Sequence, residues 1–123
     1  MSEKTLYARL GGYDAIAAVA SDLLPRLQAD ARLARFWHHR GEDGVQREKQ
    51  LLIDFLCASA GGPLYYTGRG MKESHRGMKI DAGDWAAFLG HLKATLDAFR
   101  VPQAERDEVV AFIESTRGDI VEA

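Results

Sequence analysis

Residues 62–83 form an irregular stretch between two segments that have a strong helical pattern. In the flanking segments, 47–60 and 84–99, apolar residues recur every three or four positions, which is the spacing of a helix with one buried face. The stretch between them is rich in glycine and has little regular pattern. A compact helical bundle needs only short connections, so a loop of this length favours helices packed around a pocket.

The rest of the chain also has the spacing of helices. Pro25 should kink or shorten the helix in which it lies, because proline lacks a backbone N–H. No run alternates apolar with polar residues. The sequence therefore predicts an all-α protein with four main helices in one domain, residues 1–123. Besides the two helices above, we expect an opening segment at 5–10, a helix at 13–28, a short helical turn at 30–37, a polar loop at 38–44, a second short helix at 71–78 and a last helix at 103–121.

Composition excludes several classes of function. The 16 Lys and Arg residues are balanced by 18 Asp and Glu, so the chain lacks the basic surface of a nucleic-acid-binding protein. A single cysteine, Cys57, excludes a disulfide framework and a cysteine zinc site, and we expect its side chain to be buried. The first residues do not resemble a signal peptide, and no apolar run is long enough to cross a membrane. We expect a cytoplasmic protein without nucleic-acid or membrane partners.

His75 is the strongest candidate in the sequence for a functional residue. It lies in the short segment between two glycine-rich loops, with methionines nearby. Taken alone, it is either a hydrogen-bonded core histidine or an axial ligand, which would need one neutral ring nitrogen aimed at a haem iron. Lys72 and Arg76 flank it and either form a solvated face or meet two haem propionates. We expect His91 to be a surface or rim histidine rather than a metal ligand.

A series of short motifs runs in order over nearly the whole chain. They are Thr5–Gly12, Ala15-Ile16, Arg26–Asp30, Phe55-Leu56, Gly61–Pro63, Tyr66–Gly68, Met71-Lys72, His75, Trp85 and Val101-Pro102. As an ordered set they resemble the truncated haemoglobins, the short two-over-two globins, and most closely their first group. Tyr65 and Tyr66 are expected to anchor the loop between the matched pieces.

The resemblance implies a two-over-two helical sandwich around haem b, with His75 as the proximal iron ligand. The glycine pairs Gly11-Gly12 and Gly61-Gly62 would let a shortened chain turn sharply around the cofactor. The residues expected to contact the haem are Leu24, Phe36, Trp37, Glu48, Leu52, Phe55, Met71, Lys72, His75, Arg76, Met78 and Phe88.

The distal side departs from the family. The first group commonly has a tyrosine where this chain has Leu24, and glutamine or histidine at the distal positions that fall on Glu48 and Leu52. The loop before the helix that carries Glu48 and Leu52 looks about three residues longer than usual in the family. If the alignment shifts there, Gln46 and Gln50 are alternative polar residues for the distal side. We expect a less polar distal pocket that releases oxygen quickly, unless Trp37, a glutamine or an ordered water supplies a donor.

A sixth ligand from the protein is a further alternative for the iron, and His38 and His39 are the candidates.

By the resemblance, the chain binds O2, NO and CO, and detoxification of NO by dioxygenation would need an external reductase. Whether it acts as an enzyme, as a nitric oxide dioxygenase or with peroxidase-like activity, stays open, and a monomer or weak dimer is expected. A second hypothesis is a haem-based redox or ligand sensor, or an electron-transfer protein, which an exposed apolar patch on the last helix would favour. A third is a haem-free helical interaction domain that keeps His75 in its core.

Overall fold

The computed structural model describes residues 5–37, 41–62 and 70–122, and every regular element within them is helical. Four long helices form the body: α2 (Gly12–Ala29), α3 (Glu42–Ser59), α5 (Ala82–Ala98) and α6 (Gln103–Glu114). Four short ones complete the described chain: α1 (Leu6–Leu10), the 3-10 helix η1 (Ala34–Trp37), α4 (Met71–His75) and α7 (Arg117–Ile120). The predicted all-α class is confirmed.

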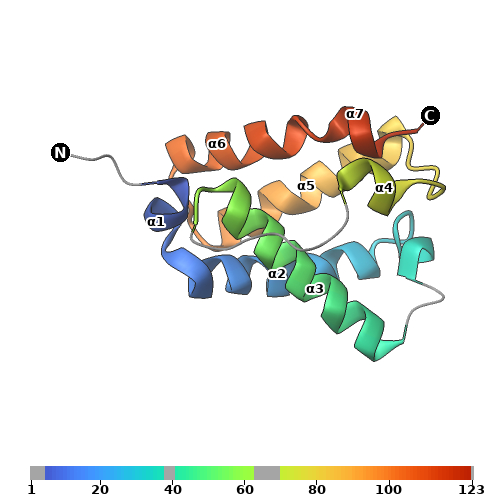
Figure 1. Ribbon diagram of the computed structural model, residues 1–123, viewed down its shortest axis with the longest axis horizontal. Coiled ribbons are helices and arrows are strands. Elements are labelled where there is room, and N and C mark those ends of the chain that lie inside the picture. The colour runs from blue at the N-terminus through green and yellow to red at the C-terminus, as the bar shows by residue number, and fades with distance from the viewer. Residues whose placement is uncertain (1–4, 38–40, 63–69, 123) are drawn as a thin grey trace.

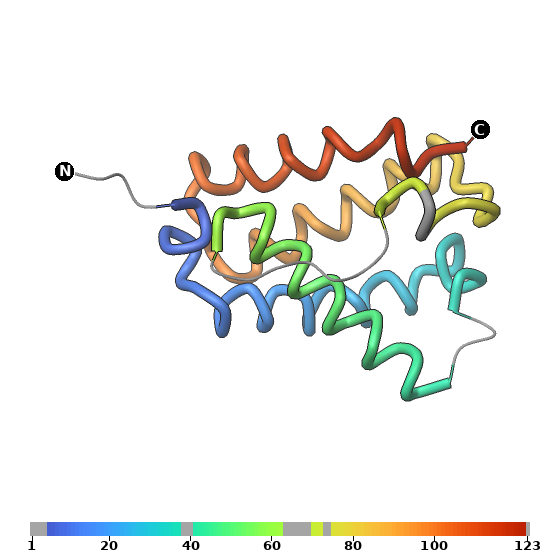
Figure 2. The backbone as a smooth tube through the Cα atoms, in the orientation of Figure 1, coloured from blue at the N-terminus to red at the C-terminus, as the bar shows by residue number. Residues whose placement is uncertain are grey.

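The long helices pack in two pairs. In Figures 1 and 2, α3 crosses α2, while α5 and α6 run alongside each other, and α2 also contacts α5. This is the two-over-two arrangement that the family resemblance implied. The core between the pairs is apolar, and its most deeply buried large side chains include Leu23, Leu92 and Leu96.

Cys57 is buried, as expected, and burial raises the pKa of its thiol. No described helix combines the length and the apolar composition that a membrane crossing requires.

One helix boundary on the first pair differs from the prediction, whereas the helix predicted at 13–28 is found as α2 to within one residue at each end. Helix α3 begins at Glu42, well before residue 47, because Glu42 and Asp43 in its first turn complement the positive end of the helix dipole. Helix α2 does not end early at Pro25 but continues to Ala29. The missing hydrogen bond at Pro25 lies on an exposed face, and burial of the apolar face on the other side maintains the helix.

Two other helices end sooner than predicted. The segment 71–78 is helical only as far as His75, and Gly77 then adopts a left-handed backbone with φ 84°. The last helix is interrupted after Glu114, where the hydroxyls of Ser115 and Thr116 donate to the carbonyls three residues before them. Such local side-chain bonds compete with helical ones, and α7 is therefore a separate turn.

A polar cluster fixes η1 and the turn before it against the start of α5. The carboxylate of Asp84 is only 1% exposed, and it accepts hydrogen bonds from Arg32 Nε at 2.8 Å and from an Arg35 guanidinium nitrogen at 2.5 Å. Asp81 and Asp84 also cap α5 reciprocally, each side chain accepting from the other's backbone N–H. Burial opposes ionisation of Asp84, but bonds from Arg35, Asp81 and Arg32 outweigh it and lower its pKa to about 2.

We expect Asp84→Asn to lower the free energy of unfolding at pH 7 by about 1 to 2 kcal/mol, discounted because both arginines are half exposed. A carboxyl whose folded pKa is lowered stabilises the protein above its ordinary pKa of about 4, and loses that effect as pH falls toward the folded value. Chemical denaturation from pH 7 to pH 2 should show the difference shrinking below about pH 4. Asp119→Asn is the exposed control. A difference that stays constant across this range would contradict this assignment.

Candidate functional site

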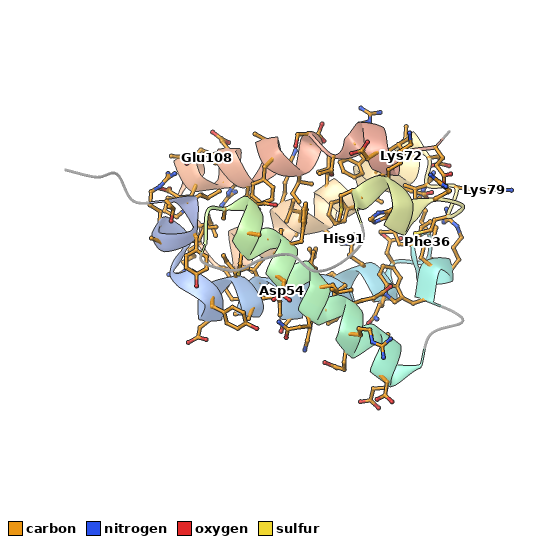
Figure 3. The ribbon with its side chains drawn as sticks, in the orientation of Figure 1. Phe36, Asp54, Lys72, Lys79, His91 and Glu108 are labelled. Atoms are coloured by element: carbon orange, nitrogen blue, oxygen red, sulfur yellow. The ribbon has the colours of Figure 1, made fainter. Side chains whose placement is uncertain are left out.

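Several side chains that could bind a metal ion or cofactor lie toward one end of the molecule. In Figure 1, η1, α4 and the start of α5 lie at the same end of the long axis. Figure 3 labels Phe36, Lys72 and His91 in this half, whereas Glu108 lies at the other end. Residues from distant parts of the sequence therefore lie at one end of the molecule, where η1 contacts α2 and α4 contacts α7.

His75 is the last residue of α4 and is half-buried. Its ring Nδ1 lies 2.8 Å from the backbone carbonyl oxygen of Met71, one turn earlier in the same helix. A carbonyl oxygen can only accept, so Nδ1 carries the proton and Nε2 carries the lone pair. A metal-ligating histidine in proteins is commonly fixed in this way, with one nitrogen donating to a carbonyl and the other left for the metal.

Apolar side chains from four parts of the fold pack against the core without being fully covered. Phe36 and Trp37 meet edge to face in η1, with ring centroids 6.5 Å apart, and Phe88 lies 5.5 Å from buried Trp85. The other members of this group that the sequence predicted at the site are Leu52, Met71 and Met78. Phe55 is half-buried as well, whereas Leu24 is buried at 7% exposure. These surfaces would be more stable beneath an apolar cofactor.

Trp37 adds a polar feature to this apolar group. Its indole Nε1 is buried and has no hydrogen-bond partner among the residues that the structure describes. Buried donors are rarely left unpaired, because losing water without gaining a partner costs about 1 to 3 kcal/mol. The chain thus presents a histidine lone pair, a partly covered aromatic and aliphatic surface, and an unused donor. This set fits a flat, largely apolar metal cofactor.

The polar residues predicted near the site have different surroundings. Lys72 and Arg76 are exposed on either side of His75, and Glu48 is half-buried on α3. Gln46 is exposed, and the exposed Gln50 donates to the Tyr13 hydroxyl and to Asp54 on the protein surface. Those contacts hold the Gln50 amide between Tyr13 of α2 and Asp54 of α3. Another set of candidates, His38, His39, Tyr65 and Tyr66, lies outside the described residues.

His91 is half-buried. Its Nε2 is 2.6 Å from the Asp30 carboxylate, which joins α5 to the end of α2. The sequence reasoning missed the neighbouring cluster of Arg32, Arg35 and Asp84, although Asp81 and Asp84 are spaced as in a capping box and could have indicated it. Among the side chains that the structure describes, no three of histidine, cysteine or acidic type gather as a metal site.

A family model, similar sequences and similar solved structures all indicate the same protein family. The model of the bacterial-like globins matches residues 5–122. A group 1 truncated haemoglobin of Tetrahymena pyriformis is 32% identical over 118 residues, covering 96% of this chain and 95% of the relative. The crystal structure of the truncated haemoglobin from that organism, in its Fe(III) form, superposes with a TM-score of 0.88 over 98% of this chain and all of the other. The 2/2 haemoglobin of Synechococcus sp. PCC 7002, crystallised with covalently attached haem, gives a TM-score of 0.85 at 28% identity, covering 96% of this chain and 98% of the other.

The two described histidines should be opposite tautomers when neutral. His75 should carry its proton on Nδ1, because that atom faces a carbonyl, and His91 should carry its proton on Nε2, because that atom faces a carboxylate. Nitrogen-15 NMR of the ring nitrogens of the cofactor-free protein, with assignments from His75→Gln and His91→Gln, checks both. Finding the Nε2–H tautomer at His75 would contradict the ligand geometry described above, while His91 serves as the internal reference.

Proposed function

Because this chain belongs to the bacterial-like globin family, as one of its truncated haemoglobins, we propose that it binds haem b and holds the iron through Nε2 of His75. The observation that carries the proposal is the contact between Nδ1 of His75 and the Met71 carbonyl, which leaves Nε2 as the basic nitrogen. A porphyrin brings its own ring nitrogens, so one protein ligand suffices. Residues 1–123 would act as one haem-binding domain.

The remaining predicted residues would surround the cofactor. Aromatic and aliphatic side chains would cover the porphyrin faces and exclude water, and they come from α2, η1, α3, the α4 segment and α5. They are Leu24, Phe36, Trp37, Leu52, Phe55, Met71, Met78 and Phe88, with Glu48 beside them on α3. The exposed cations Lys72 and Arg76 flank His75 and are suited to pair with the propionate carboxylates.

When bound, haem iron supplies a coordination position for diatomic molecules, and we propose reversible binding of O2, NO and CO there. On the distal side, Leu24 and Leu52 offer no donor. The indole N–H of Trp37 is buried and unpaired among the described residues, which supports its assignment as the donor toward such a ligand. A hydrogen bond of this kind slows ligand release by an amount that depends on the charge that the ligand carries.

We propose that the protein works in the cytoplasm, where dioxygenation of NO would require electrons from an external reductase. An exposed apolar patch on the last helix would favour the rival role as a sensor or electron-transfer protein. The large apolar side chains exposed in the described structure are Tyr13 and Phe99, which lie outside α6 and α7. That rival therefore gains no support here.

Titration with hemin tests the proposed function. Wild-type protein should take up one equivalent and give a histidine-ligated spectrum in the ferric, ferrous and CO-bound forms, because the Met71 carbonyl leaves Nε2 of His75 as a basic nitrogen. His75→Ala should lose or alter that spectrum. His91→Ala, which removes the other described histidine, should keep it. Absence of uptake by the wild type, or identical spectra for wild type and His75→Ala, would leave the chain a helical domain without a haem role.

Trp37→Phe tests the distal donor. The substitution retains an aromatic ring and removes only the N–H and part of the ring surface, so the oxygen dissociation rate should rise by roughly 10- to 100-fold, as for loss of a charge-assisted hydrogen bond of about 1.5 to 3 kcal/mol. Stopped-flow measurement against CO gives the rate. Trp85→Phe is the matched control, because that indole N–H already donates to Glu114 at 2.9 Å. An unchanged rate in Trp37→Phe removes the donor role.

A further inference from the structure

The backbone directly after His75 makes two unusual turns. Gly77 has φ 84° and Lys79 has φ 56°, so both adopt left-handed conformations within three residues. Glycine adopts this conformation readily, but lysine does so at a cost, because its Cβ crowds the backbone. Something outside the segment must therefore hold it in this shape.

Glu122 supplies that hold. Its two carboxylate oxygens accept from the backbone N–H groups of Gly77 at 3.1 Å and of Lys79 at 2.8 Å. Its own backbone N–H donates to the carbonyl of Ile80 at 2.9 Å. The carboxylate thus accepts from two backbone N–H groups of one turn, and backbone N–H groups directed at one point favour anions. These bonds lower the pKa of Glu122.

The two segments are also packed against each other. Helix α4 contacts α7, and Ile80 and Ile120 on the two sides are both 8% exposed. The Met78 N–H donates to the His75 carbonyl at 3.2 Å, which connects the turn directly to the histidine backbone. A path of hydrogen bonds therefore runs from Glu122 through the turn to residue 75.

Helix α4 needs this support because it is only five residues long. A helix of that length has few hydrogen bonds of its own and is unstable in isolation. The position of the His75 imidazole therefore depends on what fixes the residues that follow it. Outer contacts that fix a ligating histidine commonly tune the bond it makes to the metal.

We propose that Glu122 is a positioning residue for the proximal histidine: by holding the turn 77–79 it sets the orientation of His75 toward the iron. This inference rests on the proposed haem function. It assigns Glu122, far from His75 in sequence, a role in ligand binding at the iron as well as in folding.

The test compares Glu122→Ala and Glu122→Gln with Asp119→Asn, an exposed carboxylate on α7. Glutamine keeps one acceptor oxygen, so it should support one of the two N–H groups. The measurements are the iron–histidine stretching band of the ferrous, unliganded protein by resonance Raman spectroscopy and the CO association rate by flash photolysis. In Glu122→Ala the band should broaden and move to lower frequency and the CO rate should change several-fold. Glu122→Gln should be intermediate, and Asp119→Asn should match the wild type.

The outcomes separate this inference from the proposed function. A histidine band in the wild type that stays unchanged in folded, haem-loaded Glu122→Ala overturns the positioning role alone. If Glu122→Ala does not fold, Glu122→Gln decides, and an unchanged band there has the same meaning. A wild type without any iron–histidine band, or one whose band survives in His75→Ala, overturns the proposed function first. Loss of thermal stability with an unchanged band and CO rate makes Glu122 a structural residue only.

Discussion

The hydrogen bond between Nδ1 of His75 and the carbonyl of Met71 is the interaction on which the proposed haem site depends. It fixes the tautomer, and so leaves the lone pair on Nε2. It also closes the last turn of a helix that is otherwise too short to be stable. The partly covered apolar side chains and the unpaired indole N–H of Trp37 then suit the cofactor that a single oriented imidazole can hold.

Both sides of the proposed site are held by carboxylates that do not belong to it. On one side, Asp84 binds two arginines and so fixes the turn that leads into η1. On the other, Glu122 binds the backbone that follows His75. Short elements form few internal hydrogen bonds, so their positions are set from outside, here by charged groups on α5 and after α7. The long helices supply the body, and these contacts set how the short elements sit on it.

Most of the fold could be predicted from the sequence, because an apolar spacing of three and four residues directly indicates a buried helical face, as in 84–99. The residues at which helices begin and end were harder to predict. The start of α3 at Glu42 depends on acidic residues at a helix terminus, and the break before α7 depends on hydroxyl groups bonding to carbonyls. Glu122 could not be predicted, because its partners are backbone amides that carry no sequence pattern. The assignment of His75 as the iron ligand came from the family resemblance that the ordered motifs carry, and it stays a prediction.

A crystal structure of the haem-loaded protein tests the central claim most directly. It should place the iron within bonding distance of Nε2 of His75, with Nδ1 still donating to the carbonyl of Met71 and the porphyrin against the aromatic side chains of η1. Haem bound at another face, or iron held by a different residue while His75 stays in the protein interior, would contradict the claim.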